Sequence, residues 1–80
     1  MIPPQRIVKA ARLLLEWTQQ DLADHAGISI GSISRFEAGA SLSKPSMLKV
    51  ITAFEEEGVG FIFDADDNVV GVRYVGAVLS

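Results

Sequence analysis

The chain has no cysteine and only one histidine among its 80 residues. Without cysteine it cannot form disulfides, thiolate metal sites or a cysteine nucleophile, and such a composition is compatible with a reducing cytosol. No uninterrupted apolar run approaches the ~20 residues that span a bilayer, so we expect no membrane segment. The first residues, Met1-Ile2-Pro3-Pro4, lack a charged leader followed by an apolar stretch. We therefore expect no secretory signal and predict a cytoplasmic location.

The residues needed for catalysis or metal binding are scarce. His25 is the only histidine, and the nearby serines belong to the next predicted helix, so no nucleophile–base pair is evident. Asp64-x-Asp66-x-Asn68 resembles the opening of a calcium loop, but Val69 stands where such a loop needs glycine and Val75 where it needs glutamate. We expect no enzyme activity, no cofactor and no metal site.

Charge is unevenly distributed along the chain. The net charge of −3 argues at first against a polyanionic partner. Residues 1–50, however, carry six basic and four acidic side chains, for a net charge of +2, whereas residues 51–80 have a net charge of −5. Such asymmetry tells more than the total, because the first part of the chain can face a nucleic acid while the second is repelled by it.

The first half of the chain predicts short helices separated by clear start and stop signals. Pro3-Pro4 precedes a helix over about residues 5–16, whose apolar residues recur at helical spacing and are Ile7, Ala10, Ala11, Leu14 and Leu15. Thr18, followed three residues later by Asp21, forms a capping box that opens a second helix, and Gly27 ends it.

A third helix follows almost at once, and a fourth comes after a loop. Ser29 caps the third helix, whose apolar residues are Ile30, Ile33 and Phe36, and Gly39 can end it. The three residues Gly27-Ile28-Ser29 leave so short a connection that two helices must meet steeply, as in a helix-turn-helix. The fourth helix begins at Lys44-Pro45 and closes at Gly58, with five apolar residues expected to face inward: Met47, Leu48, Ile51, Ala53 and Phe54.

After Gly58 the apolar period changes from helical to two, which predicts a β-hairpin around a turn at residues 64–68. One face carries Val59, Phe61, Phe63, Val70, Val72 and Tyr74, and the other carries Ile62, Val69, Val75 and Val78. An isolated hairpin is only marginally stable, so these strands need something to pack on or pair with. We predict a mainly α fold, with a helix-turn-helix domain over residues 1–57. Residues 58–80 form a hairpin of the same compact unit and serve as its dimerisation element through Val59, Phe61, Phe63, Val70, Val72 and Tyr74.

The central segment resembles the helix-turn-helix of the phage repressor and Cro type, the XRE family of bacterial regulators. The resemblance runs from about Arg6 to about Phe54, and its motifs are Thr18-Gln19-x-x-Leu22-Ala23, Gly27-Ile28-Ser29 and Ile33-Ser34-Arg35-Phe36-Glu37-x-Gly39. It implies a lambda-repressor-like helical bundle that binds double-stranded DNA. It also implies that Arg12 pairs with Glu37, and that Gln19 fixes the DNA backbone.

Physical reasoning about the third helix points to the same partner. A helix that presents small polar residues and one arginine fits the major groove, where Arg35 can pair with guanine. The family often places long polar side chains where this chain has Ile30, which could contact a thymine methyl, and Gly31, which could let a phosphate approach. Few side chains are therefore available to contact bases, so that sequence specificity is modest or comes partly from DNA shape. The candidate DNA-contacting residues are Gln19, Ser29, Ile30, Gly31, Ser32, Ser34, Arg35, Ser43 and Lys44.

The leading hypothesis is a DNA-binding transcriptional regulator that reads a palindromic operator as a homodimer. Two alternatives stay open. The chain could be the antitoxin of a toxin–antitoxin pair and grip a toxin with its hairpin, or it could be a protein-interaction module that has lost DNA binding.

Overall fold

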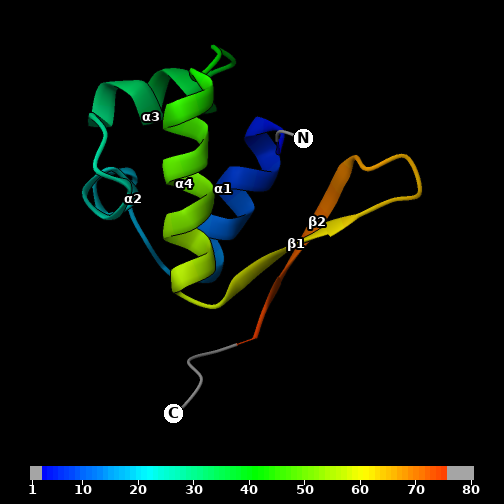
Figure 1. The fold of residues 1–80 in the computed structure, drawn as a ribbon. Coiled ribbons are helices and arrows are strands. Elements are labelled where there is room, and N and C mark those ends of the chain that lie inside the picture. Colours follow the sequence, from blue (N-terminus) through cyan, green and yellow to red (C-terminus); the bar gives the residue numbers. More distant parts are fainter. Residues whose placement is uncertain (1–2, 76–80) are drawn as a thin grey trace.

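The computed structural model describes residues 3–75 and consists of four helices followed by a two-stranded antiparallel sheet (Figure 1). This arrangement confirms the predicted fold class. The elements are α1 (Gln5–Leu14), α2 (Gln19–Ala26), α3 (Ile30–Glu37), α4 (Lys44–Glu56), β1 (Val59–Phe63) and β2 (Val69–Tyr74). None of the helices in this part of the chain is long and apolar enough to cross a membrane.

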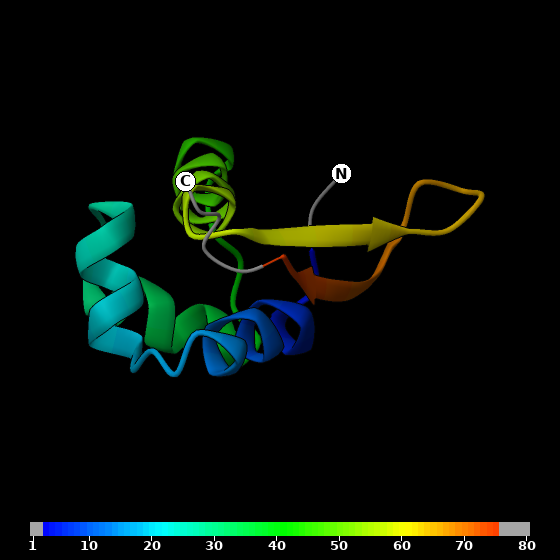
Figure 2. The ribbon, with the colours of Figure 1, turned by 90° about the horizontal axis from the view of Figure 1, so that it is seen from below.

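The hairpin packs against two helices. Figure 2 shows β1 running beside α4 and β2 beside α1, and both pairs of elements are in contact. The turn that joins the strands extends past the helices. The expectation that the strands need a surface to pack on is therefore met within the chain itself, by α1 and α4.

Local sequence signals explain most helix ends. The Thr18 hydroxyl accepts a hydrogen bond from the Asp21 N–H at 3.0 Å, and the Asp21 carboxylate accepts one from the Thr18 N–H at 2.9 Å, so the predicted capping box is present. Ser29 caps α3 through the Ser32 N–H at 3.1 Å. At the end of α2, Gly27 adopts the left-handed conformation with φ of 73°, which glycine tolerates best.

Helix α1 ends earlier than predicted, at Leu14 and not near residue 16. Glu16 takes the left-handed conformation, with φ of 57°. The Trp17 N–H then donates to the Arg12 carbonyl and the Glu16 N–H to the Leu13 carbonyl, both at 3.0 Å, which is the Schellman pattern of helix closure. Because this closure uses a glutamate where glycine is usual, the sequence carries no signal for it.

The core lies where the four helices and the hairpin meet. Its buried apolar residues are Val8, Ala11, Leu22, Ala23, Ala26, Ile33, Phe36, Met47, Val50, Ala53, Phe54 and Val59. Ala23 is 2% exposed, consistent with the small side chain needed where the two helices of the helix-turn-helix cross.

For two residues the expected place in the core is wrong. Leu14 is 44% exposed and Leu48 is 64% exposed, whereas Val8 and Val50 are fully buried in their place. In α4, Val50 continues the face that begins at Met47, and a residue next to Met47 points about 100° away from that face. In α1 the buried face includes Val8 and Arg12. A charged residue is not expected inside, but Arg12 is buried because it pairs with Glu37 of α3.

A β-bulge alters the predicted faces of the hairpin. Val59 pairs with Tyr74 and Phe61 with Val72, but the register shifts so that Phe63 pairs with Val69. As a result Val69 is 7% exposed and belongs to the core side, while Val70 is 55% exposed. The predicted alternation, with Val70 on the face of Val72 and Val69 on the other, is wrong at this point because a bulge adds one residue to one strand only. Val78, assigned to the second face, lies outside the described residues.

The bulge predicts that two adjacent valines contribute unequally to the free energy of unfolding. Val69→Ala should lower the free energy of unfolding by about 2 kcal/mol, because it removes buried methyl groups. Val70→Ala should change it by less than about 0.5 kcal/mol. Urea unfolding at low protein concentration measures both, and a larger loss for Val70→Ala would contradict the register described here.

Candidate nucleic-acid interface

Helix α3 divides into a buried face and an exposed face. Ile33 is fully buried and Phe36 is 4% exposed, and they fix the helix against the core. Gly31, Ser34 and Arg35 stand at i, i+3 and i+4 and so share one face, on which Ser34 and Arg35 are exposed. A helix held by one face and offering small polar groups and an arginine on another can enter a DNA groove.

The first turn of α3 is occupied by its own capping interactions. The Ser29 and Ser32 hydroxyl oxygens lie 2.9 Å apart, and Ser29 also accepts the Ser32 N–H. Ser29 is exposed and Ser32 half-buried, while Ile30 has 44% of its surface exposed. Ile30 therefore lies at the surface of α3.

The remaining predicted contacts flank α3 on both sides. Ser43 and Lys44 are exposed at the start of α4, where the Ser43 hydroxyl accepts the Ser46 N–H at 3.2 Å. Gln19, half-buried at the start of α2, donates from its side-chain amide to the Glu37 carboxylate at 3.1 Å. The amide of Gln19 is thus held in place by the end of α3.

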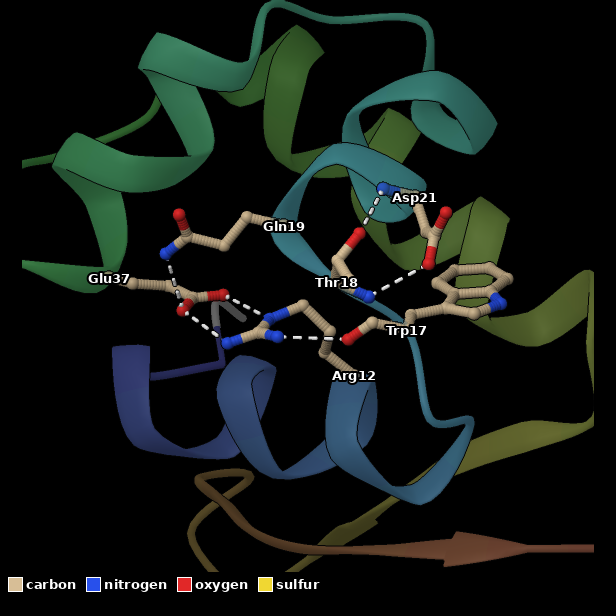
Figure 3. Close-up of polar contacts among 6 residues, drawn as sticks. All are labelled: Arg12, Trp17, Thr18, Gln19, Asp21 and Glu37. Carbon is tan, nitrogen blue, oxygen red and sulfur yellow. Dashed lines mark hydrogen bonds and ion pairs between the residues drawn. The ribbon is translucent and has the colours of Figure 1, made fainter.

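Gln19 belongs to a polar network that joins α1, α2 and α3 (Figure 3). The guanidinium of Arg12 donates twice to the Glu37 carboxylate, with both distances 2.9 Å, and a third time to the Trp17 carbonyl at 2.9 Å. The Arg12 and Glu37 side chains are 10% and 5% exposed. The pairing that the family resemblance implied is therefore present, and it fixes the end of α3 to α1.

The network also affects the ionisation of Glu37. Burial raises the pKa of this carboxyl, but hydrogen bonds from Arg12 and Gln19, together with the charges of Arg12 and Lys9, outweigh burial and hold the pKa below its ordinary value of 4.5. The carboxylate therefore stays ionised in the folded protein to a lower pH than in the unfolded chain.

Two basic residues near α3 were missed by the sequence reasoning. A groove of about 410 Å³ lies between the start of α1 and the end of α3, and its lining includes Arg6, Lys9 and Gly39. Arg6 and Lys9 are exposed. Neither was predicted as a DNA contact, because only the packing of α1 against α3 brings them beside the candidate interface.

The three consecutive glutamates that follow Phe54 lie away from this surface. Helix α4 runs from the neighbourhood of α3 to the opposite end of the bundle, where its last turn precedes β1 (Figure 1). Glu55, Glu56 and Glu57 are at that far end and are exposed. These three negative charges are therefore held at the end of the bundle opposite to α3.

Trp17 and His25 form a stack outside the α3 face. Their ring centroids are 4.1 Å apart, and Trp17 also stacks on the buried ring of Phe54 at 5.8 Å. Trp17 thus packs on the core, and His25 is exposed at the edge of that packing. Among residues 3–75 no three His, Cys, Asp or Glu side chains gather in a way that could hold a metal ion.

The Glu37 network predicts a specific pH dependence of stability. Because the pKa of Glu37 is lower in the folded state, its carboxylate adds stability above pH 4.5, and this contribution is lost as the pH falls through the folded-state value. Glu37→Gln should lower the free energy of unfolding by about 2 kcal/mol at pH 7. The difference from the parent should shrink in acid.

Urea unfolding from pH 7 to pH 3 measures this difference. Glu56→Gln, which alters an exposed carboxylate, is the matched control and should differ from the parent by less than about 0.5 kcal/mol throughout. A constant difference between parent and Glu37→Gln across that range would show that ionised Glu37 is not the stabilising species.

Comparison with known proteins gives one positive finding. A search of curated proteins finds no match. A family model described as Helix-turn-helix matches residues 8–57, which extend from α1 to the end of α4 and contain both Arg12 and Glu37. The match covers more than half of the chain and stops before the hairpin. The chain therefore belongs to the XRE family of helix-turn-helix DNA-binding transcriptional regulators.

Proposed function

We propose that the chain acts as a homodimer that reads a palindromic operator by inserting α3 into the major groove. The observation that supports this proposal is the division of α3, whose Ile33 and Phe36 are buried while Ser34 and Arg35 remain exposed on the opposite side. One such helix contacts too few base pairs for useful affinity. Two copies set ~34 Å apart would contact two half-sites one helical turn apart.

Base readout in this proposal rests mainly on Arg35. Its guanidinium can pair with both acceptors of a guanine, whereas Ser34 can contact either a base or a phosphate. Gln19, Ser43 and Lys44 flank α3 and would contact the phosphate backbone, which fixes the register of the helix on the duplex. The rigid hold of Glu37 on the Gln19 amide nitrogen supports this role, because it leaves the amide oxygen and backbone of Gln19 in a fixed place.

The hairpin supplies the dimer contact in this proposal. Ile62, Phe63, Val70, Tyr74 and Val75 are between 43% and 58% exposed, a large apolar surface for so small a domain. In the described part of the chain the sheet has two strands, so each strand also has one edge that is not paired with another strand. A second copy could pair with such an edge or pack on the exposed apolar side chains.

The packing narrows the predicted set of dimer contacts. Val59 is 1% exposed and belongs to the core, and Phe61 and Val72 are partly buried against the same core. Phe63, Val70 and Tyr74 are the predicted contacts that remain exposed. We propose these three, together with Ile62 and Val75, as the dimer surface.

Selection from a random-sequence DNA pool tests the reading of DNA. The parent should enrich a palindromic sequence, and Arg35→Ala should bind the enriched duplex at least about tenfold more weakly and lose preference at one base pair of each half-site. Arg73→Ala removes an exposed charge from the hairpin and should bind within about twofold of the parent. All three are compared at one stated salt concentration. An Arg35→Ala protein that binds as well as the parent, or a pool without enrichment, would contradict the proposal.

Sedimentation at micromolar concentration tests the dimer. The parent should sediment as a dimer, and Phe63→Lys or Val70→Lys should yield monomers, because each buries a charge in the proposed interface. Leu48→Lys changes an apolar residue on α4 that is somewhat more exposed than either, and this variant should remain dimeric. A monomeric parent would refute the homodimer. If such a monomer co-purified with the product of a neighbouring gene, the hairpin would be better assigned to a toxin partner.

A further inference from the structure

The side chain of Arg35 lies over Gly31, one turn earlier in α3. A methyl group built at Gly31 would lie 3.1 Å from Nη1 and 3.9 Å from Cζ of Arg35. At 3.1 Å this contact is closer than an ordinary van der Waals contact, so a side chain at position 31 would displace the guanidinium by a few tenths of an ångström. The hydroxyl oxygen of Ser29 lies 3.9 Å from the same point.

The backbone gives no other reason for glycine here. Gly31 lies within α3 and is not among the glycines with positive φ, which are Gly27, Gly39 and Gly58. A glycine inside a helix destabilises it relative to alanine, because the unfolded chain loses more freedom. What glycine provides at this position is room on the exposed face of α3.

We infer that Gly31 is a positioning residue for DNA reading, because it leaves room for the Arg35 guanidinium to lie beside Gly31 on the exposed face of α3. This inference rests on the proposed function, in which that face enters the major groove. An exposed arginine otherwise samples many rotamers, and ordering it on binding weakens the complex. Placed over Gly31, Arg35 is directed to one base-pair position before DNA arrives.

The inference differs from the simpler idea that Gly31 makes room for a phosphate. The group that occupies the space above Gly31 is the guanidinium of the chain's own Arg35. Gly31 would then set specificity without touching DNA, through the direction that it allows Arg35 to take. The two ideas give different results when both residues are changed together.

A double-mutant cycle of Gly31→Ala and Arg35→Ala separates the two ideas. The probe is the duplex that the parent enriches from a random-sequence pool. Gly31→Ala should weaken binding by about fivefold to tenfold in the parent but by less than about twofold in Arg35→Ala, because its effect passes through the arginine. The melting temperature of Gly31→Ala should rise, since alanine favours the helix, so weaker binding cannot be attributed to unfolding.

Nuclear magnetic resonance of the arginine side chains tests the same point without DNA. In the parent, the Nε–H group of Arg35 should be more ordered than those of the exposed Arg6 and Arg73, with the hydrogen-bonded Arg12 as the rigid reference. In Gly31→Ala, Arg35 should become as mobile as Arg6 and Arg73.

Two results would overturn the inference. One is an equal loss of affinity from Gly31→Ala in both backgrounds, and the other is an Arg35 side chain equally mobile in the parent and in Gly31→Ala. Failure of the proposed function looks different, because Arg35→Ala alone would then bind the enriched duplex as well as the parent. In that case the mobility of Arg35 still decides whether Gly31 positions it.

Discussion

The paired hydrogen bonds between Arg12 and Glu37 hold the three helices around the helix-turn-helix together. They join the first helix to the last turn of α3, and the Glu37 carboxylate also holds Gln19 at the start of α2. A chain of 80 residues has a small core, and this pair fixes α3 in addition to the packing of Ile33 and Phe36. Removing one partner of such a buried pair leaves the other charge poorly solvated, which is why both residues have to be kept together.

The hairpin and the helix-turn-helix pack on one shared core. Val59 and Val69 anchor the strands to α1 and α4, while neighbouring side chains of the strands stay exposed. The bulge makes this division possible, because it turns Val69 inward and leaves Val70 outside. An exposed apolar hairpin joined rigidly to the bundle would hold two copies of α3 at a fixed separation, as a palindromic site requires.

The sequence predicted the helices and the helix-turn-helix well, because their signals are local. Thr18, Ser29 and Gly27 are chemically suited to the ends that they form, and the strand ends at Phe63 and Val69 match the predicted turn. The failures at Leu14 and Val70 arise from contacts between elements, whereas the failure at Leu48 concerns helical periodicity within α4. The buried Arg12 and the bulge are set by partners distant in sequence, and the seat of Arg35 over Gly31 depends on a side-chain rotamer that no spacing rule specifies.

The most direct test that α3 reads DNA is to map the protein's backbone amide resonances during titration with the enriched duplex. If α3 enters the groove, the perturbed amides will belong to α3, to the start of α2 around Gln19 and to Ser43 and Lys44. The amide resonances of Glu55, Glu56 and Glu57 at the far end of α4 will not shift. Perturbations confined to the hairpin or to the far end of α4, with α3 unchanged, would contradict this arrangement.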